Sequence, residues 1–114
     1  MDIEALRAYV TELKEGIEEA FPFGPDTLVF KYGGKIFLLM ALDEVPPRVN
    51  VKCDPDRALE LREAYPAIIP GYHMNKKHWN TLILDGSLPH KLVKELVADS
   101  LELIAAKLPK GKRS

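Results

Sequence analysis

A pair of adjacent glycines between two apolar runs constrains the fold of this chain more than any other feature. The runs Leu28–Tyr32 and Lys35–Leu42 consist mostly of large apolar side chains of the kind that fill strands. Gly33 and Gly34 separate the runs, and two glycines adopt the positive φ angles of a tight primed turn without steric cost. The sequence therefore predicts a β-hairpin, and with it an antiparallel sheet.

A third strand is predicted at Arg48–Cys53, because the side chains there alternate in character. Three apolar side chains fall on one face and three polar ones on the other: Val49, Val51 and Cys53 against Arg48, Asn50 and Lys52. One buried face and one wet face are typical of an antiparallel sheet that helices cover on one side. On the apolar face Cys53 is expected to be a small buried hydrophobic residue rather than a nucleophile.

Three helices are predicted around these strands. Apolar residues recur at three- and four-residue spacing from about Asp2 to Glu15 and from about Pro89 to Leu108. Between them, Asp54 and Pro55 have the residue types of an N-cap and a first helical position, and this helix is expected to end near Tyr65.

Two further stretches complete the expected order. A short strand should run from Trp79 to Leu84. The stretch Ile17–Asp26 is expected to be an irregular connector, because its prolines and glycine oppose regular structure, with Phe21 and Phe23 anchoring it to the core. The order α-β-β-β-α-β-α predicts an α+β fold, a two-layer sandwich with the N- and C-terminal helices on one face of the sheet.

The composition is that of one folded domain spanning residues 1–114. Hydrophobic residues make up 46% of the chain and charged residues 29%, which excludes an intrinsically disordered chain. The single cysteine cannot form an internal disulfide, so we expect a reducing, cytoplasmic setting. No apolar run approaches the roughly 20 residues of a membrane span. We therefore expect no membrane partner, and we favour a monomer.

The charges are unevenly spread, although the net charge is only −1. Residues 1–27 carry seven acids against two bases, and the rest of the chain carries a net charge of +4. No acid occurs between Glu63 and Asp85. A polarised molecule with one basic face is suited to an anionic partner such as nucleic acid.

The stretch Tyr72–Asn80 is the first candidate for contact with such a partner. It concentrates bases, amides and aromatics: Tyr72, Asn75, Lys76, Lys77, His78, Trp79 and Asn80. Lysines meet phosphates, amides bond sugar or base edges, and aromatics stack on bases. The alternative is that the aromatics are packed under the sheet and the lysines are only solvated.

The polar face of the sheet is the second candidate. Arg48, Asn50 and Lys52 share that face, and Lys31 and Lys35 flank the glycine turn, so together they form a basic surface beside the loop. The alternative is that these charges are merely solvated.

Metal and catalytic sites find little support. His73 and His78 are five residues apart with no cysteine or carboxylate between them, which matches no zinc pattern. No glycine-rich phosphate loop and no Ser-His-Asp order is present. We therefore expect no enzyme activity, no metal and no cofactor.

Several of these stretches resemble the signature of the MmcQ/YjbR family of small bacterial proteins. They are Lys52-Cys53-Asp54-Pro55, the run from Pro70 to Asn80, Asp85-Gly86, Gly33-Gly34-Lys35 with Phe37, and Ser100. The resemblance implies a fold similar to CyaY and frataxin, and DNA binding through a double wing. The wings would be the hairpin at Gly33-Gly34 and the loop that contains Asn75, Lys76, Lys77 and His78.

A CyaY-like fold also raises iron binding at an acidic ridge, for which the crowded acids are Glu12, Glu15, Glu18, Glu19 and Asp26. Acidic helices are usually only solvated, and fold analogy alone is a weak basis for function.

The predicted function is therefore DNA binding. The residues expected to take part are Lys76, Lys77, Asn75, His78, Tyr72, Asn80, Lys35, Arg48 and Lys52. The alternative is a small-molecule or protein-binding domain without catalytic activity that uses the Tyr72–Asn80 loop as a pocket wall. Salt dependence separates the two hypotheses, because phosphate contacts release counterions.

Overall fold

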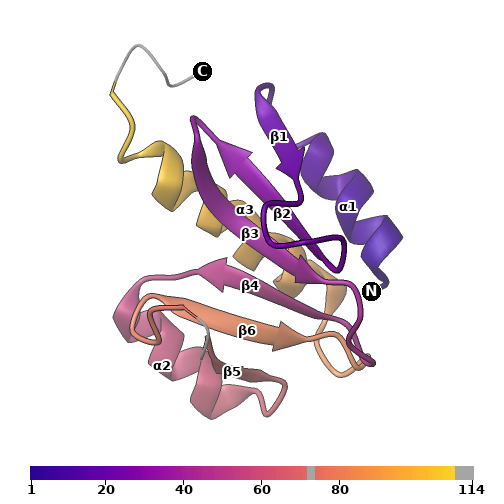
Figure 1. Cartoon of the computed structure of the whole chain (residues 1–114). Coiled ribbons are helices and arrows are strands. Elements are labelled where there is room, and N and C mark those ends of the chain that lie inside the picture. Colours follow the sequence, from indigo (N-terminus) through magenta and orange to yellow (C-terminus); the bar gives the residue numbers. More distant parts are fainter. Residues whose placement is uncertain (72–73, 110–114) are drawn as a thin grey trace.

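The computed structural model describes residues 1–71 and 74–109, and it confirms the α+β class. Six antiparallel strands form one sheet in the order β1-β2-β3-β4-β6-β5, with the three helices behind it (Figure 1). The helices are α1 (Ile3–Thr11), α2 (Pro55–Ala64) and α3 (His90–Ala105). The strands are β1 (Ile17–Ala20), β2 (Thr27–Tyr32), β3 (Lys35–Ala41), β4 (Arg48–Lys52), β5 (Ile68–Pro70) and β6 (Trp79–Ile83).

The predicted hairpin joins β2 to β3 and is confirmed. Gly33 and Gly34 have φ angles of +59° and +81°, which side chains rarely adopt. A Cβ added to Gly33 would lie 2.4 Å from Leu108 Cδ1, so the turn also seats the end of the last helix. The glycine pair thus sets both the hairpin and the position of the segment after α3.

All three helices cover one face of the sheet and bury its apolar side chains. Central members of this core, all at most 1% exposed, are Leu6, Val10, Phe30, Phe37, Met40, Val49, Val51, Ala58 and Val97. α3 lies across β3 and β4, and it brings the largest number of core residues of any helix. The two-layer sandwich with the terminal helices on one face is confirmed.

One buried hydroxyl connects α3 to the sheet where the strand pairing is irregular. β2 and β3 change register between Phe30 and Lys31, so β3 has an extra residue at Phe37. Ser100 Oγ donates to the Phe37 carbonyl at 2.6 Å and accepts from the Lys52 amide at 2.8 Å. The Ser100 side chain therefore satisfies two backbone groups that the strand ladders leave unpaired.

The second helix begins as its sequence predicts. Asp54 is the N-cap of α2, its carboxylate accepts from the Arg57 amide at 3.3 Å, and Pro55 occupies the first turn. Ala58 and Leu61 form the buried side of the helix. Local capping chemistry was sufficient to place this element.

The expectation for residues 17–26 is wrong in two respects. Residues Ile17–Ala20 form the edge strand β1, paired with β2, because the prolines and the glycine begin only after it, at Pro22. Phe21 and Phe23 are 49% and 65% exposed, so they do not anchor the segment to the core.

Two further differences concern an additional strand and the end of the first helix. β5, a strand that was not predicted, pairs with β6 and ends in Pro70, a residue that a sheet edge tolerates. The first helix ends at Thr11 rather than Glu15.

Within the described residues, no helix has the length and apolar character needed to cross a membrane.

No helix of the described residues covers the other face of the sheet, but this face is not purely polar. Val29, Leu39 and Trp79 form a second buried cluster there, and the partly buried Ile36 and Met74 pack against it. Polar residues of the same face include Asn50 and Thr81. This open face therefore combines apolar and polar side chains.

Candidate nucleic-acid interface

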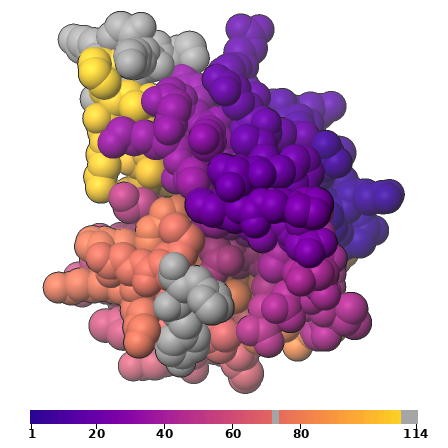
Figure 2. Space-filling view, in the orientation of Figure 1, coloured from indigo at the N-terminus to yellow at the C-terminus, as the bar shows by residue number. Residues whose placement is uncertain are grey.

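Four segments that are distant in sequence meet at one end of the sheet. Lys52, at the end of β4, is the cross-strand partner of Trp79 at the start of β6, and the 74–78 loop immediately precedes Trp79. The β2–β3 turn lies at the same end, where Leu108 after α3 sits on Gly33. In Figure 2 the C-terminal part of the chain, in yellow, lies beside the purple hairpin.

These segments contribute five lysines, which we call the lysine end: Lys35, Lys52, Lys76, Lys77 and Lys107. Four of the five belong to the predicted set, and Asn75 and His78 lie in the same loop. The structure therefore brings most of the predicted residues to one end of the molecule, from both predicted wings.

Lys52 carries the strongest electrostatic signature in this group. Its pKa falls from the ordinary 10.5 to about 8. The main cause is the hydrogen-bond contact with the Lys107 amine, followed by partial burial and by the positive charges of Lys107 and Lys35. The positive charges of Lys107 and Lys35 thus repel the Lys52 ammonium at the end of β4, and an anion placed beside it would relieve that repulsion.

Acids next to Lys52 are partly neutralised by an arginine. A shallow pocket of ≈ 440 Å³ beside Lys52 is also lined by Arg57, Asp99 and Glu102. Arg57 bonds Asp99 at 2.5 Å and Glu95 at 3.2 Å, so it pairs with two of the α3 acids. Asp54 and Glu102 also line this pocket, and neither forms an ion pair among the described residues.

The loop before β6 is held in a defined shape. Asn75 Oδ1 accepts from the Lys77 amide at 2.9 Å, and the Asn75 carbonyl accepts from the His78 and Trp79 amides at 3.1 and 2.9 Å. Arg62 donates to the Lys76 carbonyl at 3.1 Å and ties the loop to α2. Asn75 therefore shapes the turn that exposes the side chains of Lys76 and Lys77.

Two of the predicted residues, Arg48 and Asn80, are not part of this surface. Arg48 begins β4, at the opposite end of the strand from Lys52, and its Nε atom is buried without a hydrogen-bond partner among the described residues. Asn80 is 1% exposed, and its amide donates to the Ala58 carbonyl at 3.4 Å, so its predicted contact with sugar or base is wrong for this conformation. Tyr72 lies outside the described residues, as does His73.

Lys107 was missing from the predicted set although its position could be inferred. The helical spacing of α3 and the bases after Glu102 predict a positive charge at the C-terminal end of the last helix. The missing information was that this end lies on the hairpin turn, which depends on the packing of Leu108 against Gly33.

Other reactive groups support neither a nucleophile nor a metal centre. Cys53 is 7% exposed and burial raises the pKa of its thiol, so it remains protonated, as expected of a small core residue. Among residues 1–71 and 74–109, no three histidine, cysteine or acidic side chains gather closely enough to hold a metal. The absence of a metal or catalytic site in the whole chain stays a prediction.

The fold and the lysine end define a small α+β domain with one helix-covered sheet and a basic end. The YjbR family model matches residues 13–103, and the chain belongs to this family. The family resemblance inferred from the sequence is therefore confirmed.

Relatives and solved structures agree with this assignment. The chain is 43% identical over 94 residues to the uncharacterized protein YbdF of Escherichia coli O157:H7, a match that covers 82% of this chain and 77% of YbdF. It is 33% identical over 100 residues to the uncharacterized protein YjbR of Escherichia coli K12, covering 88% and 85% of the two chains.

Among solved structures, the crystal structure of Deinococcus radiodurans protein DR2400, with its DUF419 domain, superposes with a TM-score of 0.89 at 42% identity. This match covers 97% of the chain and 84% of DR2400. A crystal structure of a Pseudomonas syringae protein superposes with a TM-score of 0.78 at 28% identity, covering 90% and 98% of the two chains.

Proposed function

We propose that this protein binds DNA through the lysine end. The observation that carries the proposal is the close approach of Lys52 and Lys107, with Lys35 nearby, at the end of the sheet that also presents the 74–78 loop. The neighbouring positive charges of Lys107 and Lys35 make the Lys52 ammonium costly to keep charged in the free protein. Phosphate groups would lower that cost, which is the thermodynamic basis for preferring a polyanion.

The two basic elements can contact one backbone together. Lys52 and Trp79 are cross-strand partners, whose Cα atoms are about 5 Å apart in an antiparallel pair. Lys77 lies two residues before Trp79. Lysines meet phosphates as point charges and carry no sequence information, so this surface suits backbone contact rather than base recognition.

The proposal is tested by fluorescence anisotropy with a labelled duplex and a labelled single strand, from about 50 to 200 mM salt, where phosphate binding weakens steeply. The wild type should bind in a salt-sensitive way. Lys76→Ala/Lys77→Ala should reduce the slope of log affinity against log salt by about 0.9 for each duplex phosphate that the variant no longer neutralises.

A matched control is Lys91→Ala/Lys94→Ala, which removes the same charge from the first turns of α3, at the far end of that helix from Lys107. Lys94 lies over the Tyr9 ring at 5.3 Å, so the fold of this variant should be checked by its melting curve. The proposal fails if the wild type does not bind at low salt, or if the control variant is weakened as much as the loop variant.

One observation favours the alternative of a binding domain that uses the loop as a pocket wall. Met74, from this loop, lines a pocket on the open face of the sheet. That pocket is separate from the lysine end, so ligand binding there and DNA binding are compatible.

Four finer expectations stay proposals at this point. They are the double-wing geometry, the likeness to CyaY and frataxin, the cytoplasmic location and the absence of catalysis. The first is the most closely tied to the lysine end, because hairpin and loop both contribute lysines to it.

A further inference from the structure

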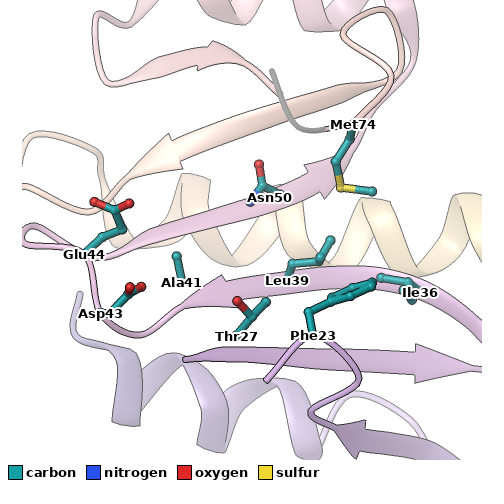
Figure 3. A pocket seen from close by; sticks show the side chains of 9 residues that line it. All are labelled: Phe23, Thr27, Ile36, Leu39, Ala41, Asp43, Glu44, Asn50 and Met74. Atoms are coloured by element: carbon teal, nitrogen blue, oxygen red, sulfur yellow. The ribbon is translucent and has the colours of Figure 1, made fainter. Parts of the chain in front are cut away.

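The open face of the sheet holds a pocket of ≈ 430 Å³ that the DNA proposal does not use. Its floor is formed by β2, β3 and β4, and the loops after β1 and before β6 lie over its margins (Figure 3). A volume of this size lies within the usual range for small-molecule sites, about 300–1,000 Å³.

One end of the pocket is apolar. It is lined by Phe23 from the loop after β1, Ile36 and Leu39 from β3, and Met74 from the loop before β6 (Figure 3). Phe23 is 65% exposed although it lies against this pocket. A phenylalanine side chain so placed leaves apolar surface in water, which a bound apolar body would cover.

The middle of the floor offers hydrogen bonding. Thr81 Oγ1 donates to Asn50 Oδ1 at 2.5 Å, and this contact fixes the orientation of the Asn50 side chain. Asn50 lines the pocket, and no acceptor for its Nδ2 group is seen among the described residues. The Asn50 amide is therefore available to donate to a ligand.

The opposite end of the pocket is acidic. Asp43 and Glu44 lie there, both exposed, and neither forms an ion pair with a described residue (Figure 3). Their segment is fixed on both sides, because the Leu42 amide bonds the Asp26 carbonyl at 2.8 Å and the Leu84 amide bonds the Pro47 carbonyl at 2.9 Å.

One base lies in the neighbourhood of these acids. Arg48 pairs with Ala41 across β3 and β4, but it does not line the pocket and makes no salt bridge within the described residues. Two carboxylates against one guanidinium leave this end net negative.

We propose that this pocket binds a small organic amine, with its apolar body between Phe23 and Leu39 and its ammonium group at Asp43 and Glu44. The apolar end supplies most of the contact area, and the acids select for positive charge. This inference does not rest on DNA binding, since its residues are distinct from the lysine end.

The test uses two amines with different apolar bodies, tryptamine and hexylamine, at pH 7. Each is compared with its alcohol and its carboxylate, tryptophol and indole-3-acetate, hexanol and hexanoate. Binding is followed by the amide shifts of the ¹⁵N-labelled protein. At least one amine should bind at least tenfold more tightly than its alcohol and carboxylate, with the largest shifts near Leu39, Ala41 and Asn50.

Two variants locate the site. Asp43→Asn/Glu44→Gln keeps the side-chain shapes and should reduce amine affinity to that of the alcohol while leaving DNA binding unchanged. Ala41→Leu partly fills the pocket and should weaken all bound probes, whereas Leu59→Ser, on the exposed side of α2, should not. Absence of binding by both amines at 10 mM, equal affinity for amine and carboxylate, or shifts confined to another surface would each overturn the proposal.

Discussion

The two faces of the sheet differ in how completely their side chains are buried. On the face covered by helices, Phe37, Met40 and Val49 are fully buried in one continuous core. On the open face, a small apolar cluster around Leu39 borders a pocket, and charges gather at both ends of the sheet. The covered face accounts for the stability of the fold, and the open face with its ends retains the groups that can still bind partners.

The largest expected effect contrasts an apolar side chain from each face. Phe37→Ala should lower the free energy of unfolding by about 3–5 kcal/mol, because it leaves a cavity in a closed core. Leu39→Ala should cost about 2 kcal/mol or less, since Leu39 belongs to a cluster of three buried residues beside a pocket that water can enter.

Urea unfolding monitored by Trp79 fluorescence and by circular dichroism measures both variants. Equal destabilisation by the two substitutions would contradict the distinction between the faces and would mean that the open face is as tightly packed as the core.

The sequence was informative wherever local chemistry decides. Gly33-Gly34 required a tight turn, Asp54-Pro55 required a helix start, and alternation along β4 identified its buried face. These features involve residues within a few positions of one another, so they can be inferred without knowing the rest of the fold.

The remaining features depend on contacts between distant segments. The strand Ile17–Ala20 contains Glu18-Glu19 and lacks a strand-like apolar pattern, and it becomes a strand because it pairs with β2. The same limit explains the candidate site. Alternation puts Arg48 and Lys52 on one face, but they are four positions apart, about 13 Å, and occupy opposite ends of β4, so Arg48 is not part of the lysine end.

The second prediction concerns the Ser100 hydroxyl, which links helix α3 to strands β3 and β4 beside Lys52. Ser100→Ala should cost about 1–3 kcal/mol, because it leaves the buried Phe37 carbonyl and the Lys52 amide without their partner. Ser87→Ala, in an exposed turn, should cost much less. If both substitutions cost the same in urea unfolding, the Ser100 hydroxyl is not a link between the two layers.

The smallest expected effect lies at the lysine end, where Lys52 is held close to Lys107. The pKa of Lys52 is about 8 in the folded protein against an ordinary value of 10.5, so the folded state binds fewer protons than the unfolded state between these pH values. Stability should therefore rise as the pH increases from about 8 to 10.5, and the repulsion should be fully present below pH 8. Because Lys52 is only partly buried, solvent still screens the repulsion and keeps this contribution under about 1 kcal/mol.

Lys107→Gln removes the main cause of the shift, so the pKa of Lys52 should return toward 10.5 and the rise in stability above pH 8 should become smaller than in the wild type. Titration of the lysine Nζ resonances by NMR, together with urea unfolding at pH 7 and 9.5, measures both effects. DNA should also raise the pKa of Lys52 in the wild type, because phosphates favour its charged form. An unchanged pKa in Lys107→Gln would show that burial rather than charge repulsion lowers the pKa of Lys52. The lysine end would then lack its electrostatic reason to bind an anion.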